Sequence, residues 1–147
     1  MTDDLVKFLR ARLEEDEQIA RKAATRQPGG EAWTYEQPEL RAASGLPIAK
    51  RQVPVLGEHI ARHDPARVLR DVEAKRAILS AYERALAIAA QWGENLQAWE
   101  KGEVPPHPGT VVSNSSQAME QPGLHAAMRC FAAVYAGHPD YREEWRP

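Results

Sequence analysis

The chain has 147 residues, of which 43% are hydrophobic and 27% charged, and its formal net charge is -2 at pH 7. This is the composition of one globular domain rather than a disordered chain, and the small negative charge predicts neither nucleic acid nor membrane as a partner. The single cysteine, Cys130, excludes an intramolecular disulfide framework and indicates a reducing compartment. With no signal segment and no apolar run long enough to span a membrane, we expect a cytoplasmic protein.

The first predicted helix begins near Thr2 and fades near Ala24, before the Pro-Gly-Gly turn at 28–30. Its apolar side carries leucines four residues apart: Leu5, Leu9 and Leu13. Acidic and basic side chains at the same spacing, such as Glu17 and Arg21, cover the rest of its surface. This pattern is typical of an amphipathic helix with one buried side.

Residues 27–57 contain repeated prolines and glycines, and no helical period survives there. We therefore expect an irregular or weakly β arm. Two stretches, 32–35 and 52–56, have strand-like composition, although Pro54 confines the second to a sheet edge or excludes it. A two-stranded ribbon and a long wrapped loop are equally compatible with this composition.

The strongest helix prediction starts at Asp64, which suits an N-cap, and Pro65, which suits the first helical position. Apolar residues then recur at helical spacing from Val68 to Trp99. The helix is predicted to end at Lys101-Gly102, a cation followed by a capping glycine.

A last helix is predicted over about 122–136, where apolar residues again follow the helical period, and Gly137-His138-Pro139 stops it. In the tail, Tyr141 and Trp145 should share one side of a single turn and dock onto the helices. Together these elements predict a mainly α, three-helix bundle-like single domain, residues 1–147, with one long central helix.

Three blocks of sequence resemble an uncharacterised family of small helical proteins from high-GC soil bacteria and their phages, known only as a domain of unknown function. The blocks are Met1 to Leu13, His59 to Arg76, and His138 to Pro147. They lie at both ends and in the middle, so the resemblance covers the whole chain. One departure is Pro28-Gly29-Gly30-Glu31-Ala32-Trp33, which stands where such proteins often have a Pro-Gly-Pro-Trp-like turn. The resemblance implies no particular activity.

His59 and His63 are four residues apart, which is the spacing of two metal ligands on one helix face. No glutamate stands between them where a zinc protease has its general base, and no third ligand is evident. Candidates from elsewhere are His125, Cys130 and His138. A cation beside Cys130 favours a reactive thiol, but its apolar sequence neighbours make a buried, inert thiol the preferred interpretation. We predict no cofactor, and a metal-dependent enzyme centred on His59 and His63 is one alternative.

The middle of the chain is basic, and residues 41–76 carry most of that charge. Arg62, Arg67 and Arg70 are its candidate phosphate contacts, so a nucleic-acid-associated regulator is a second alternative. Stacking aromatics are scarce there, which makes nucleic acid the weaker prediction. The preferred interpretation is that the basic middle forms ion pairs within the chain, with the acidic first helix and the acidic tail.

Trp92, Leu96 and Trp99 form one apolar stripe near the end of the long helix. Burial under the tail's Trp145 is the preferred interpretation, and an exposed partner surface is the other, since tryptophan is enriched at interface anchors. No arrangement of residues indicates a catalytic site. We therefore predict a non-catalytic helical adaptor or regulatory protein that binds another protein of unknown identity and also a second copy of itself.

Overall fold

The computed structural model describes residues 2–103 and 122–147. The chain divides into two compact units. One unit contains Met1–Leu9 and Ala77–Pro147, and the other contains Arg10–Arg76. We call the first the terminal unit and the second the central unit. The fold is mainly helical with a small antiparallel sheet, as the sequence predicts.

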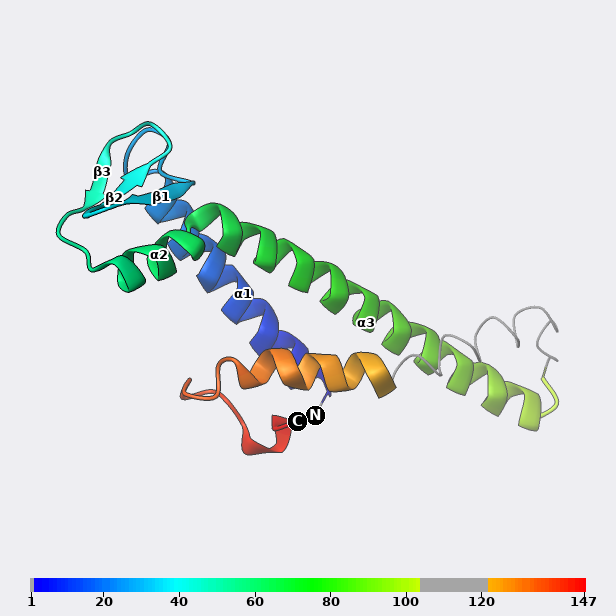
Figure 1. The fold of residues 1–147 in the computed structure, drawn as a ribbon. Helices are drawn as coiled ribbons and strands as arrows, with labels where there is room; N and C mark the ends of the chain where they lie inside the picture. The colour runs from blue at the N-terminus through cyan, green and yellow to red at the C-terminus, as the bar shows by residue number, and fades with distance from the viewer. Residues whose placement is uncertain (1, 104–121) are drawn as a thin grey trace. The chain divides into compact units, whose positions relative to one another are not determined.

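Two long helices have the ends that the sequence predicts. Helix α1 spans Thr2–Ala24 and helix α3 spans Pro65–Glu100 (Figure 1). At the end of α3, Gly102 adopts a positive φ of 77°, its N–H donates to the Trp99 carbonyl, and the next N–H donates to the Ala98 carbonyl. This pair of hydrogen bonds is a Schellman motif, which explains why a glycine ends the helix here.

The central unit carries a three-stranded antiparallel sheet in the order β1-β2-β3 (Figure 1). The strands are β1, Trp33–Glu36, β2, Glu39–Ala42, and β3, Pro47–Ala49. Strand β1 pairs with β2 from Trp33↔Ala42 to Glu36↔Glu39, and the pairing of β2 with β3 is irregular between Leu40 and Arg41. The arm is therefore weakly β, and the strand predicted at 32–35 is confirmed one residue further on.

The second predicted strand, 52–56, is wrong. These residues lead into helix α2, which spans Pro54–Arg62 and packs against β1 and β2. Val53 is extended, and Pro54 takes the first helical position. A proline's missing N–H costs nothing there, and its fixed φ suits a helix start. The same residue that argued against a central strand therefore begins a helix, and the arm ends before residue 57.

In the terminal unit, residues 122–133 are helical and are followed by turns up to 137, so the last predicted helix ends slightly early. The tail forms a single 3-10 turn, η1, at Glu143–Trp145. Phe8 is the centre of an aromatic cluster there: its ring lies 4.9 Å from Trp145 and 6.3 Å from Tyr141, centroid to centroid. Tyr141 also contacts Trp145 at 6.0 Å, so the predicted docking of the tail is confirmed.

The cores of both units are apolar, and the described residues contain no buried charged side chain. In the central unit the buried side chains are Leu13, Ala20, Leu40, Ala42, Pro65 and Val72. In the terminal unit they are Leu5, Val6, Phe8, Leu9, Leu79, Tyr82, Ala85, Met128, Ala132 and Trp145. Within the described ranges, every helix is too short or too polar to cross a lipid bilayer.

Candidate functional site

The junction between α2 and α3 joins the sheet of the central unit to its helices. Asp64 caps α3, with Oδ1 accepting a hydrogen bond of 2.7 Å from the Arg67 N–H. Its Oδ2 accepts from the backbone N–H of Trp33 at 3.3 Å, and the Ala66 N–H donates to the Glu31 carbonyl at 2.8 Å. One carboxylate thus fixes both the helix start and the first strand, which confirms the predicted cap.

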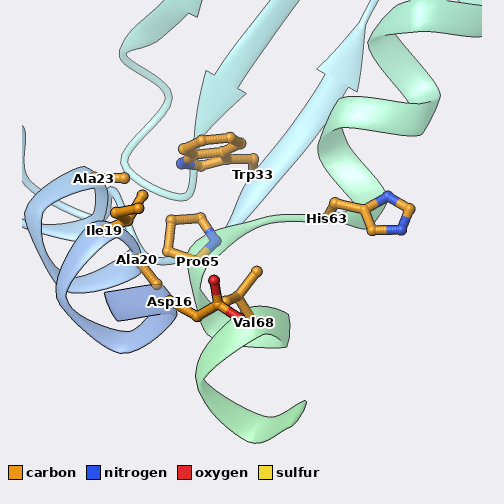
Figure 2. A pocket seen from close by; sticks show the side chains of 8 residues that line it. All are labelled: Asp16, Ile19, Ala20, Ala23, Trp33, His63, Pro65 and Val68. Atoms are coloured by element: carbon orange, nitrogen blue, oxygen red, sulfur yellow. The ribbon is translucent and has the colours of Figure 1, made fainter. Parts of the chain in front are cut away.

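A cavity of about 270 Å³ opens beside this junction (Figure 2). It is lined by Asp16, Ile19, Ala20, Ala23, Trp33, His63, Pro65 and Val68. The Trp33 Nε1–H donates to the Gly30 carbonyl at 2.6 Å, so the polar edge of the indole is already bonded within the chain. An apolar cavity of this size is at the lower limit of small-molecule sites, at roughly 300 Å³, and suits a single apolar side chain.

The two titratable residues of this cavity do not form an acid–base pair. Figure 2 shows the His63 imidazole turned away from Trp33 and Pro65, toward the outside of the cavity. The His63 Nδ1 instead makes a hydrogen bond of 2.9 Å with the His59 carbonyl. General acid–base chemistry needs its groups within hydrogen-bond reach of one another or of a bound substrate. The two titratable side chains that line the cavity are therefore not paired with each other.

The structure brings His59 and His63 together, as their spacing predicts. Their ring centroids are 4.5 Å apart and the rings are tilted by 36°. Among the described residues, however, no group of three or more histidine, cysteine, aspartate or glutamate side chains is placed to hold a metal ion. The pair is an exposed feature at the end of α2.

The other proposed ligands have different surroundings. A hydrogen bond of 2.6 Å joins the His125 Nδ1 to the Tyr82 hydroxyl, and the His138 Nδ1 accepts from the Asp140 N–H at 3.1 Å. Cys130 is exposed, so the predicted burial of its thiol is wrong. On a helix, a residue two positions from the buried Met128 points roughly 200° away from it, which places Cys130 on the outer side.

Arg62, Arg67 and Arg70 are all exposed. Arg67 donates from Nη1 to the Arg62 carbonyl at 3.1 Å, and none of the three forms an ion pair with a carboxylate of the described chain. Within the described ranges these three charges have no carboxylate partner, and the nucleic-acid hypothesis stays a prediction.

Glu17 provides the internal charge match that the sequence favours. It accepts hydrogen bonds from Arg21 at 2.8 Å and from Arg76, 59 positions along the chain. These hydrogen bonds hold the pKa of the Glu17 carboxyl below its ordinary value of 4.5, and the bond from Arg21 has the largest effect. Part of the basic middle thus pairs with the acidic first helix inside the central unit.

The stripe on α3 is more exposed than the preferred interpretation expects. Leu96 is 39% and Trp99 is 55% exposed, while Trp92 is half-buried. Trp145, which was expected to cover this stripe, packs on Phe8 instead. The core interpretation is therefore wrong for Leu96 and Trp99, and the tail does not explain why two large apolar side chains lie one turn apart on the surface.

Sequence reasoning missed a second exposed apolar group, at the start of α2. Val53, Val55 and Leu56 are all more than half exposed. The composition of residues 52–56 predicts a strand that Pro54 confines to a sheet edge or excludes, and it gives no indication of a helix. The signal that could have identified the helix is Pro54 itself, because proline is common at the first position of a helix. The nine residues after it contain no further proline and no pair of glycines, so they can continue the helix.

These features define a small, mainly helical protein with a three-stranded sheet and exposed apolar surfaces on both units. The model of the family of unknown function DUF6221 matches residues 2–147, so the chain belongs to that family. This agrees with the resemblance to an uncharacterised family, whereas the bacterial and phage source stays a prediction. No curated protein and no solved structure matches the chain.

Proposed function

We propose that the protein is a small non-catalytic adaptor or regulatory protein that acts through protein–protein contacts, first of all with a second copy of itself. The observation that carries the proposal is the exposed Leu96–Trp99 stripe at the end of α3. Large apolar side chains grouped on a surface mark interaction sites, and tryptophan is among the residues that contribute most binding free energy.

The spacing of the stripe supports a second helix as the partner. From Tyr82 onward, apolar side chains continue at intervals of three and four through Leu86, Ala89, Trp92, Leu96 and Trp99. Tyr82, at the beginning of this series, is buried, whereas Leu96 and Trp99, at its end, are exposed. Such spacing suits side-by-side packing of helices. A second copy offers the same stripe, and a two-fold arrangement buries both copies at once.

The test is the mass of the purified full-length protein in solution, measured by sedimentation over a range of concentrations. The chain weighs 16.4 kDa, and we expect the mass to rise toward twice this value as concentration increases. Trp99→Ser should weaken the association about tenfold or more, because an interface anchor contributes on the order of 2 kcal/mol.

Val134→Ser is the matched control, because Val134 is also exposed and apolar and lies in the same unit. It should leave the association unchanged. A mass of one chain at every concentration, or equal association by wild type and Trp99→Ser, would contradict the proposal.

A further inference from the structure

The inner face of α2 is fixed against the sheet by close packing. Gly57 is buried, and a Cβ built on it would come within 2.2 Å of the ring of Tyr35. The Tyr35 hydroxyl donates to the Gln52 carbonyl at 2.8 Å, and the Gln52 N–H donates to the Pro38 carbonyl at the same distance. These contacts determine which side of the helix is left for solvent.

We use the name α2 face for five of the exposed residues on that outer side, Val55, Leu56, His59, Arg62 and His63, and Glu58 is exposed at its edge. Val55 is 78% and Leu56 is 55% exposed. Because 3.6 residues make one helical turn, Val55, His59 and Arg62 lie in one row along the helix. Aliphatic side chains thus occupy the first turn of the face, and imidazole and guanidinium groups occupy the last.

The charge around the face is positive. Between residues 50 and 67 the chain has four lysines and arginines against two carboxylates, Glu58 and Asp64. Asp64 is already engaged in capping α3, and Arg62 makes no ion pair with a described residue. Because no carboxylate of residues 2–103 or 122–147 forms an ion pair with these cations, the charge of the face is complementary to an acidic partner.

We infer that the α2 face binds an acidic, amphipathic segment of another protein. Aliphatic side chains of that segment lie on Val55 and Leu56, and its carboxylates pair with Arg62 and the two imidazoles. The aliphatic half of the face decides for protein over nucleic acid, whose phosphates and bases gain little from valine and leucine. This surface lies on the central unit, so the inference stands independently of the α3 stripe.

The experiment uses fluorescence anisotropy with a labelled synthetic helical peptide that has leucine at i, i+3, i+4 and i+7 and glutamate at its remaining exposed positions. The full-length wild-type protein should bind it and should bind much more weakly a peptide with every glutamate replaced by glutamine, or every leucine by serine. Leu56→Ser and Arg62→Glu should each weaken binding about tenfold or more.

Two matched variants control for general surface effects. Leu46→Ser removes an exposed apolar side chain from the turn between β2 and β3, and Lys22→Glu reverses an exposed charge on α1, so both should bind the peptide like wild type. Circular dichroism of each variant verifies that it is folded. Trp99→Ser should also bind normally, which separates this inference from the proposed function.

Two further probes decide between kinds of partner: vesicles containing phosphatidylglycerol, and a short DNA duplex. The inference predicts that both bind more weakly than the acidic peptide at the same ionic strength. It is overturned if either binds more tightly than the peptide through Arg62 and Leu56, or if the peptide binds wild type no better than Leu56→Ser.

Discussion

At the scale of single residues, two residues of the central unit, Glu17 and Gly57, determine how neighbouring elements pack. Glu17 joins α1 to α3 through Arg76, and Arg21, on α1 itself, also donates to the Glu17 carboxylate. Gly57 lets α2 lie directly on Tyr35. Both contacts lie beside candidate binding surfaces rather than in them, so their effects should be visible in stability.

The Glu17 contact predicts a pH-dependent loss of stability. Because arginine hydrogen bonds lower the pKa of this carboxyl in the folded state, its contribution is fully present above the ordinary value of 4.5. The contribution is lost as pH falls through the lower, folded-state pKa. Glu17→Gln should therefore unfold at lower urea concentration than wild type at pH 7. At pH 3 the gap between the two should narrow, and a gap that widens on acidification would contradict this account.

Gly57→Ala should destabilise the protein by about 1–3 kcal/mol, since the new methyl group must displace the Tyr35 ring in a packed contact. Gly93→Ala is the matched control, because nothing lies within 4 Å of a Cβ there and the position is inside α3. That variant should gain roughly 0.5–1 kcal/mol from the better helix propensity of alanine. Urea unfolding of both variants provides the measurement, and equal effects would disprove the packing of α2 on Tyr35.

At the scale of elements, the sequence predicts those whose local signals are long and consistent. The ends of α1 and α3 follow from apolar periods of several turns together with caps such as Asp64 and Gly102. Helix α2 has only nine residues, too few for a period to stand out, and its first proline reads as a strand breaker. The exposure of Cys130 was mispredicted because neighbours in sequence are not neighbours on a helix face.

The Asp64 cap can be tested by substitution. Asp64→Ala should cost roughly 0.5–2 kcal/mol in the free energy of unfolding, because the Arg67 and Trp33 N–H groups both lose their acceptor. Asp71→Ala removes an exposed aspartate that pairs with Lys75 at 2.5 Å, and should cost only about 0.5 kcal/mol or less. Thermal unfolding followed by circular dichroism compares the two, and an equal loss would mean that Asp64 does not cap the helix.

At the scale of the whole molecule, each unit has its own apolar core and its own exposed apolar group. The sequence predicts the class of fold and the docking of the tail, but not which tryptophans are buried. Trp99 and Trp145 are similar as residue types, and only the tertiary packing of Phe8 distinguishes them. Among the candidate site residues, the spacing of His59 and His63 is enough to predict that their imidazole rings lie together. Whether Arg62 has an ion-pair partner could not be predicted, because that depends on which carboxylates the fold brings near it.

Trp145 should be essential to the terminal unit. It is 4% exposed and packs on Phe8, so Trp145→Ala should destabilise the protein by about 3–5 kcal/mol, as expected for a large buried side chain. Val134→Ala, at an exposed position of the same unit, should stay within about 0.5 kcal/mol of wild type. Urea unfolding monitored by circular dichroism distinguishes them, and a mild effect at Trp145 would show that the tail is dispensable.

The central claim is that this chain works by presenting the end of α3 to a second protein surface. The most direct measurement is a dilution series of amide NMR spectra on the assigned full-length protein. We predict concentration-dependent shifts of the amides around Leu96 and Trp99, with those of the sheet in the central unit unchanged. Spectra that stay the same at every concentration, or shifts confined to residues away from α3, would contradict it.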